Sequence, residues 1–275
     1  MLRISVIVPV FNASRWIDGC IQGLLNQDYD PARFEIIMVD NNSPDDSSAR
    51  IRRCDRIRLL HEAEQSSYAA RNRGVRQACG EVLAFTDSDC APAPNWLSVI
   101  DRAMRNPQTQ VVLGAREFAS HSRAVQLLAT YEDARVEYIL TKQRKNSYFG
   151  FTNNMAIRRA AFEQHGPFPV VARGGDTLFL QKLAEAEGPE AAVWNPEMRI
   201  SHLELRDAWT YLRKSFTYAR ARQRTKHLGQ CAVLAPKECL QIFHRVTRSQ
   251  PALDKILLAF LLSTGRLTWA AGSLL

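Results

Sequence analysis

The first part of the chain alternates between short apolar segments and segments with helical spacing. Four segments have the Val, Ile and Leu content of buried strands: 4–11, 34–40, 57–61 and 81–87. The segments between them are predicted helices: 16–27, 43–54, which Ser43 would cap, and 67–79. Such alternation implies a parallel sheet wound by right-handed crossovers. We therefore expect an α/β fold with a mostly parallel central sheet flanked by helices. Further strands are expected at 111–118 and around 151–157.

Polar side chains follow each predicted strand of this sheet. They are Asn12, Asp40, His61 with Glu62, and Asp87 with Asp89. In open α/β folds, ligands bind at the carboxyl ends of the strands, so these side chains would share a crevice. Gathered carboxylates repel one another unless a cation neutralises them, and hard ions such as Mg²⁺ and Mn²⁺ prefer oxygen ligands. The Asp-x-Asp spacing by itself is also common in solvated loops.

Net positive charge is concentrated near the C-terminus. Residues 1–205 carry 24 Lys and Arg against 25 Asp and Glu, whereas residues 206–248 carry 10 against 2. An even basic coat would suggest nucleic acid; a near-neutral body with a basic extension favours a membrane surface or a phosphate-bearing partner. We expect a catalytic domain at 1–205, a helical C-terminal extension at 206–275, and no nucleic-acid partner.

Cysteine usage and the N-terminus favour an intracellular protein. The six cysteines form no Cys-x-x-Cys pair, and the apolar start of the chain is too short and too β-branched for a secretory signal. We expect reduced thiols and a cytoplasmic location.

Asp176 follows two glycines and precedes an apolar helical segment. This position places it near a helix N-terminus, on backbone able to approach a ligand. It could equally be an ordinary N-cap.

Four ordered blocks together resemble the inverting glycosyltransferases of family 2, which have the GT-A fold. The blocks are SVIVPVFN, EIIMVDNNSPD, AARNRGVRQACGEVLAFTDSD and GFTNNMAIRRAAFEQHGPFPVVARGGDTLFLQKL. The resemblance covers roughly residues 3–205. It implies a metal-dependent hexosyltransferase-like enzyme that uses a nucleoside diphosphate sugar, with Mn²⁺ or Mg²⁺, for cell-surface polysaccharide or glycolipid synthesis.

The resemblance also implies roles for individual residues. Asp89, helped by Asp87, matches the metal-binding pair, and Asp176 matches the general base. Relatives usually read Glu-Asp at that base, whereas this chain reads Gly175-Asp176. His202 lies about where relatives supply a further metal or phosphate contact, although a lone histidine after a strand is often structural. The residues matched to the nucleotide are Pro9, Phe11, Asn12, Asp40, Arg71 and Asp87.

Two other functions remain open at this stage. A sugar-phosphate nucleotidyltransferase would have a glycine-rich basic loop after the first strand, where this chain has FNASRW. A non-catalytic nucleotide-sugar-binding or scaffold member of the same fold would not need Asp87, Asp89 and Asp176 together.

The C-terminal extension contains two predicted helices. Residues 205–224 form a basic amphipathic pattern, with Arg206, Arg213, Arg220 and Arg224 on one face. Residues 256–275 are long enough to cross a bilayer, but Arg266 and a small or polar stripe favour a helix lying in the interface, with Leu261 and Trp269 on its apolar face. We expect a protein peripheral to the cytoplasmic face of the inner membrane.

The acceptor, a carbohydrate or a lipid-linked molecule, would contact variable loops such as 119–149. The candidate residues there are Tyr131, Glu132, Arg135, Tyr138 and Lys142.

Overall fold

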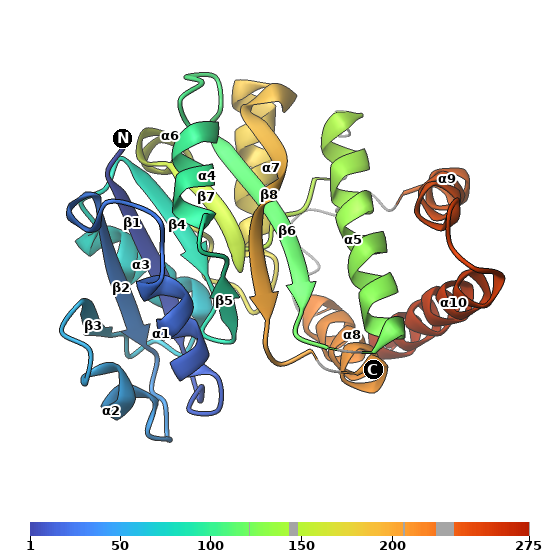
Figure 1. The fold of residues 1–275 in the computed structure, drawn as a ribbon, viewed down its shortest axis with the longest axis horizontal. Coiled ribbons are helices and arrows are strands. Elements are labelled where there is room, and N and C mark those ends of the chain that lie inside the picture. Colours follow the sequence, from blue (N-terminus) through green and yellow to red (C-terminus); the bar gives the residue numbers. More distant parts are fainter. Residues whose placement is uncertain (121, 143–147, 206, 224–233, 275) are drawn as a thin grey trace.

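The structure is a computed structural model that describes residues 1–120, 122–142, 148–205, 207–223 and 234–274. Its described strands form one mixed sheet of eight strands in the order β3-β2-β1-β4-β7-β6-β8-β5 (Figure 1). The strands are β1 (Ile4–Val10), β2 (Phe34–Asp40), β3 (Ile57–His61), β4 (Val82–Thr86), β5 (Cys90–Pro92), β6 (Val111–Phe118), β7 (Asn154–Arg158) and β8 (Ala192–His202).

The N-terminal half of the sheet is parallel, as expected. β1 pairs in parallel with β2 and with β4, and β2 pairs in parallel with β3. β7 then inserts antiparallel between β4 and β6, and the short β5 is antiparallel to β8. The four predicted N-terminal strands, and the one predicted at 111–118, are confirmed to within a residue of their ends.

Helices cover both faces of the sheet (Figure 1). Ile7 of β1 joins a core formed with α3, α6 and α7, whereas its neighbours Val6 and Val8 join a second core formed with α1 and α4. This alternation follows from the two-residue period of a strand whose two faces are both buried. The helices are α1 (Ile17–Leu25), α2 (Ser47–Ile51), α3 (Ser67–Gln77), α4 (Trp96–Ala103), α5 (Arg123–Thr141), α6 (Arg159–His165), α7 (Gly175–Glu187), α8 (Ala208–Gln223), α9 (Pro236–Thr247) and α10 (Ala252–Leu274).

The helix predicted at 43–54 is much shorter than expected. α2 begins at Ser47, after Asp46, so Ser43 does not cap it. The Ser43 hydroxyl instead accepts a hydrogen bond from the Asn12 backbone N–H at 3.2 Å, and the Ser43 N–H donates to Asp40 Oδ1 at 3.3 Å. Ser43 therefore ties together the loops that follow β1 and β2, a contact that local helix signals do not reveal.

A buried asparagine stabilises an irregularity between β6 and β8. The register of the two strands shifts between Gly114 and Ala115. Asn154 Nδ2 donates to the carbonyls of Ala115 and Met198, and its Oδ1 accepts from Trp96 Nε1 at 2.8 Å. The register shift leaves the carbonyls of Ala115 and Met198 without partners in the ladder. The side-chain amide of Asn154 supplies the hydrogen bonds that allow these carbonyls to be buried. The second part of β8 then continues to His202.

The segment predicted as a variable loop, 119–149, is mostly a long helix, and that prediction is wrong. α5 packs against α9 and α10. Of the acceptor candidates, Tyr131 is buried, Glu132 pairs with Arg135 at 2.7 Å, and the Tyr138 hydroxyl donates to Gln241 Oε1 of α9 at 3.2 Å. Apart from the exposed Lys142, these side chains already have partners within the protein or are buried in its core.

The C-terminal helices pack on α5 and on one another rather than standing apart (Figure 1). Arg123 of α5 pairs with Asp254 of α10 at 2.6 Å, and Glu137 pairs with Arg245 of α9 at 2.8 Å. Leu261 is buried in the main core, so the prediction that it lies on a free apolar face is wrong. The boundary at residue 205 stays a prediction. Arg206, Arg224 and the side chain of Arg220 lie outside the described residues.

Five cysteines are free thiols in the described part of the chain, as expected: Cys20, Cys54, Cys79, Cys90 and Cys239. Cys231 lies outside the described residues.

Candidate active site

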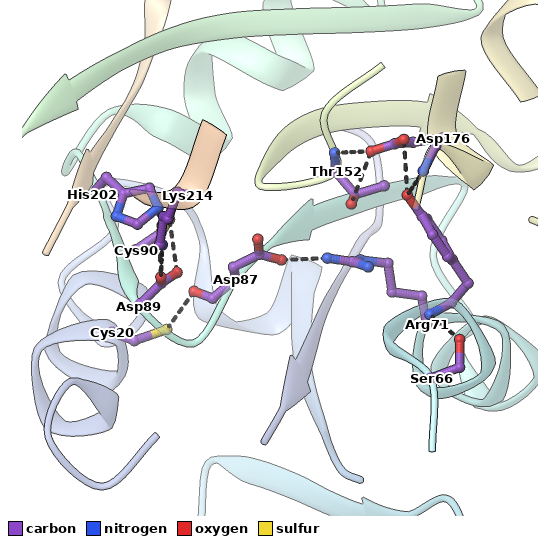
Figure 2. A network of polar contacts seen from close by, with 12 residues as sticks. Cys20, Ser66, Arg71, Asp87, Asp89, Cys90, Thr152, Asp176, His202 and Lys214 are labelled. Atoms are coloured by element: carbon purple, nitrogen blue, oxygen red, sulfur yellow. Dashed lines mark hydrogen bonds and ion pairs between the residues drawn. The ribbon is translucent and has the colours of Figure 1, made fainter. Parts of the chain in front are cut away.

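The acidic pair lies where β4 ends, at the edge of the sheet predicted from the sequence. Arg71 of α3 forms an ion pair with Asp87 (Figure 2). The Arg71 side chain is almost fully buried, and its Nε has no hydrogen-bond partner. A buried guanidinium is stable only when paired, so Asp87 and Arg71 hold each other in place at this edge.

Asp89 lies in a separate cluster of polar side chains (Figure 2). Its Oδ2 is 3.5 Å from His202 Nε2 and 4.0 Å from the ammonium of Lys214, and Cys90 Sγ is 3.5 Å from its Oδ1. Lys214 also pairs with Glu204 at 2.5 Å. Burial, and then the charge of Asp87, raise the pKa of Asp89 to about 7. The ammonium of Lys214 opposes this shift without cancelling it.

His202 is buried in the same cluster without satisfactory hydrogen bonding. Its Nδ1 is buried and has no partner, and its Nε2 is too far from Asp89 for a normal hydrogen bond. Burial, together with the charge of Lys214, lowers the pKa of His202 to about 4, so the imidazole is neutral at physiological pH. A neutral imidazole and a carboxylate side by side are both ligands that a divalent cation accepts. Asp89 and His202 are the residues that would hold it.

Asp176 lies at the other end of the site, in the first turn of α7, as predicted. It does not cap the helix through its side chain; Gly174, with a φ of 85°, precedes the helix there. Its Oδ1 accepts from the Tyr68 hydroxyl and the Thr177 N–H, both at 2.9 Å. Its Oδ2 accepts from the Thr152 N–H at 3.1 Å and from the Thr152 hydroxyl at 3.4 Å. Burial raises the pKa of Asp176, although the charge of Arg71 and these hydrogen bonds oppose the shift.

Arg71 connects the two ends of the site (Figure 2). Its guanidinium pairs with Asp87 and lies 5.5 Å from the ring centre of Tyr68, whose hydroxyl donates to Asp176. The turn that carries Asp176 therefore lies in the same network as Asp87, rather than folding away from it. The structure brings together Arg71, Asp87 and Asp176, and separately Asp89 with His202.

The residues predicted to contact the nucleotide lie at the ends of β1 and β2. Phe11 is 54% exposed, and Asn12 has a positive φ of 50°, which turns the chain at this edge. Asp40 ends β2, half-buried. Pro9 is buried one residue before the end of β1, opposite Val39, so its side chain packs inside the sheet. Phe11, Asn12 and Asp40 thus surround an accessible edge, whereas Pro9 shapes it from within.

Sequence reasoning missed five residues of the site: Tyr68, Cys90, Thr152, Glu204 and Lys214. Tyr68 is one turn before Arg71, and Cys90 follows Asp89 directly, so proximity to a predicted residue was the available signal. The same signal was available for Glu204, two residues after His202. Thr152 and Lys214 reach the site through long-range packing and carry no local signal.

Comparison with known proteins identifies the family of this chain. The model of the family described as glycosyl transferase family 2 matches residues 5–166. The chain belongs to glycosyl transferase family 2. It is 30% identical over 191 residues to the glycosyltransferase AglE of Haloferax volcanii, an alignment that covers 66% of this chain and 62% of that protein. It is 29% identical over 169 residues to the putative glycosyltransferase EpsH of Bacillus subtilis, covering 59% and 48%. This family 2 chain therefore aligns with about half to three fifths of each relative's length.

Solved structures confirm the fold of this family 2 member. A mannosyltransferase from Pyrobaculum calidifontis, in complex with GDP-Man and Mn²⁺, superposes with a TM-score of 0.64 at 20% identity, over 98% of this chain and 74% of that one. S. aureus TarS in complex with UDP-GlcNAc superposes with a TM-score of 0.58 at 16% identity, over 97% and 81%. The predicted GT-A fold is correct.

Proposed function

We propose that this protein transfers a sugar from a nucleoside diphosphate sugar to an acceptor hydroxyl with inversion at the anomeric carbon. The observation that carries the proposal is the connected path from Asp87 through Arg71 and Tyr68 to Asp176. It connects the edge that we propose to bind the diphosphate with the buried carboxylate that we propose as the base. A single displacement needs one base on the acceptor side and charge stabilisation on the donor side, and no covalent intermediate.

Asp176 is the proposed base that takes the proton of the acceptor hydroxyl. A carboxylate offers about four lone-pair positions, and the present contacts fill them all. The contact from the Thr152 hydroxyl, at 3.4 Å, is the longest of the four. It is therefore the one that we expect an acceptor hydroxyl to replace, while the backbone N–H groups and Tyr68 keep the carboxylate oriented.

The donor side combines fixed and bound positive charge. Arg71 and Lys214 are cations of the chain itself near Asp87 and Asp89. Mn²⁺ or Mg²⁺ held by Asp89 and His202 would supply Lewis-acid stabilisation of the departing diphosphate. Phe11, Asn12 and Asp40 would border the base and ribose at the ends of β1 and β2.

A panel of nucleotide sugars tests this function. We expect at least one donor, with GDP-Man and UDP-GlcNAc among the first to try, to raise the melting temperature more with Mn²⁺ than without it, since a ligand that binds only folded protein stabilises it. The anomeric configuration of the product, read by NMR, should be opposite to that of the donor. Retention of configuration would refute the single displacement, and donor binding with neither transfer nor donor hydrolysis would favour a non-catalytic binding protein.

The cellular setting that we propose is the cytoplasmic face of a membrane, with a carbohydrate or lipid-linked acceptor. None of the helices in the described ranges is both long and apolar enough to cross a bilayer. α10 nevertheless exposes a row of large apolar side chains at helical spacing, more than 60% accessible each: Leu253, Ile256, Phe260 and Leu267. Its opposite face, with Leu258 and Leu261, is already used in the core.

Basic side chains near this row of apolar side chains favour an anionic partner for it. A hollow of about 660 Å³ between α9 and α10 is lined by Arg245, Arg248 and Lys255 together with His244. Arg266 is exposed on α10 itself. Apolar side chains next to cations match an anionic lipid surface, where the side chains enter the acyl boundary and the cations meet phosphates. We therefore propose that α10 lies flat on such a surface.

Vesicle binding tests this placement. We expect Ile256→Glu with Phe260→Glu to abolish sedimentation with vesicles that contain phosphatidylglycerol, because buried glutamates oppose insertion among anionic lipids. The matched control, Gln22→Glu with Gln108→Glu, adds the same charge at exposed sites in the N-terminal part of the sheet domain and should still bind. Equal binding of both double variants, or wild-type protein that forms dimers through α10 instead of binding vesicles, would refute the membrane role.

A further inference from the structure

The residue that follows the acidic pair adds a thiol to the proposed cation site. Cys90 is the first residue of β5, and its pairing partner in the antiparallel ladder is His202 of β8. Directly opposed residues of such a ladder project from the same face, with Cβ atoms about 4.5–5.5 Å apart. The pairing therefore places the Cys90 thiol and the His202 imidazole side by side, next to the carboxylate of Asp89 (Figure 2).

The three side chains have the spacing of a ligand set. Cys90 Sγ lies 3.5 Å from Asp89 Oδ1, and His202 Nε2 lies 3.5 Å from Asp89 Oδ2. One ligand atom from each residue lies within 4.8 Å of the other two. In a tetrahedral site, a metal–sulfur bond of about 2.3 Å and a metal–oxygen bond of about 2.0 Å separate those two ligand atoms by roughly 3.5 Å.

The histidine and the thiol of this set are buried, and the imidazole is poorly hydrogen-bonded. Cys90 is fully buried and His202 is 7% exposed, and Nδ1 of His202 has no hydrogen-bond partner. A buried imidazole nitrogen without a partner is costly in a finished structural network. The His202 imidazole and the Cys90 thiol both face the carboxylate of Asp89, which also lies 4.0 Å from the ammonium of Lys214. A bound cation would replace the long contact between His202 and Asp89 with direct bonds to both side chains.

We propose that this is a mixed carboxylate, thiolate and imidazole site, in which Asp89, Cys90 and His202 bind a borderline ion such as Zn²⁺ or Co²⁺ in competition with Mn²⁺ and Mg²⁺. The inference rests on the proposed function in placing the donor's cation at Asp89. Hard ions prefer oxygen ligands and would leave the thiol protonated. A borderline ion forms a bond with the sulfur, and the thiol proton is released to solvent. A fourth position stays open to water or a phosphate oxygen.

The consequence is that Cys90 determines metal selectivity. Almost any site with nitrogen and oxygen ligands binds Zn²⁺ more tightly than Mn²⁺, so tight zinc binding alone would not implicate the thiol. Removal of Cys90 separates the two explanations, because it should weaken binding of thiophilic ions and leave the binding of Mn²⁺ unchanged.

Titration of the full chain with Co²⁺ tests the proposal without any sugar or turnover. We expect wild-type protein to develop a near-ultraviolet sulfur-to-cobalt charge-transfer band that saturates at one ion per chain and is displaced by Zn²⁺. Cys90→Ser should lack the band and should bind Cd²⁺ at least about tenfold more weakly, with unchanged Mn²⁺ affinity. The absence of a band in the wild type, or its persistence in Cys90→Ser, would overturn the proposal.

Two further cysteines provide controls. Cys20 is buried, with its Sγ 3.6 Å from the Asp87 carbonyl, so Cys20→Ser shows whether this neighbouring thiol is the ligand instead. Cys54→Ser removes a thiol three residues after α2, which is not part of the cluster of Asp89, Cys90 and His202. Both variants should keep the band, and its loss in Cys20→Ser would reassign the ligand and refute the role of Cys90.

Two further measurements test the proposal even if Cys90→Ser does not fold, since position 90 is fully buried. Cys90→Ala keeps an apolar side chain at this position and should also lack the band. X-ray absorption of the cobalt-loaded wild type should show one sulfur neighbour at about 2.3 Å, and only nitrogen or oxygen neighbours would overturn the proposal. Because these measurements report ligation alone, they can fail while sugar transfer succeeds, and the reverse also holds.

Discussion

Asp176→Asn lowers the rate of sugar transfer by about 10² to 10⁴, and donor affinity stays near that of the wild type. The asparagine amide can keep the shape of the side chain and part of its hydrogen bonding, but it cannot accept the proton of the acceptor hydroxyl. The measurement is single-turnover transfer to a verified acceptor, with donor binding measured separately by calorimetry.

Asp101→Asn is the matched control for this loss. Asp101 is also a buried carboxylate that accepts from a tyrosine hydroxyl, Tyr29 at 3.0 Å, and from a backbone N–H, Leu2 at 2.6 Å. It lies on α4, outside the network of Asp176. We expect this variant to lose stability and to keep its transfer rate. Undiminished transfer by Asp176→Asn would show that another group is the base.

The pH dependence of the same step follows from the hydrogen bond of Tyr68. Burial is the largest influence and raises the pKa of Asp176, while the Tyr68 hydroxyl lowers it by stabilising the carboxylate. Tyr68→Phe removes that contribution, so the pKa of Asp176 rises. Because the base must be ionised, the acidic limb of the profile of kcat/KM against pH should move to higher pH, with activity recovered above it. An acidic limb at the wild-type position would separate Tyr68 from the base.

Asp89→Ala removes the metal dependence of donor binding. Asp89 is the carboxylate that Cys90, His202 and Lys214 surround, so its loss takes away the anionic ligand and leaves a cation beside a neutral histidine. Changes to outer groups around a metal ligand already cost about 10- to 100-fold in affinity, and the loss of the ligand itself should cost at least as much. Binding of a nucleoside diphosphate with and without Mn²⁺, measured by calorimetry, should become the same.

Two further results bear on this assignment. Asp55→Ala, which removes an exposed carboxylate, should leave the Mn²⁺ effect intact.

Since burial and Asp87 raise the pKa of Asp89 to about 7, Mn²⁺ and protons compete for this carboxylate. The affinity of the wild type for Mn²⁺ should therefore fall as the pH drops below about 7. An Asp89→Ala protein that still needs Mn²⁺ for tight donor binding would remove Asp89 from the metal site.

Local patterns were sufficient for the parallel part of the sheet. β1, β2, β3 and β4 are short apolar segments bounded by turn residues, and because both faces of these strands are buried, their composition alone distinguishes them. The interpretation of 119–149 as a variable loop was wrong. α5 presents Leu127, Leu128 and Val136 to the core, but whether that face is covered depends on α9 and α10, more than 90 residues later in the chain.

The sequence by itself determined the α/β order, the acidic pair at the end of β4 and the position of Asp176 at the start of α7, because each depends on residues that are neighbours in the chain. Only the tertiary structure decided which side chains meet across the site. Arg71 pairs with Asp87 and links it to the side of the site that carries Asp176. Cys90 of β5 is the ladder partner of His202 of β8. Such contacts join residues up to about a hundred positions apart, and strand register and helix packing, rather than local spacing, bring them together.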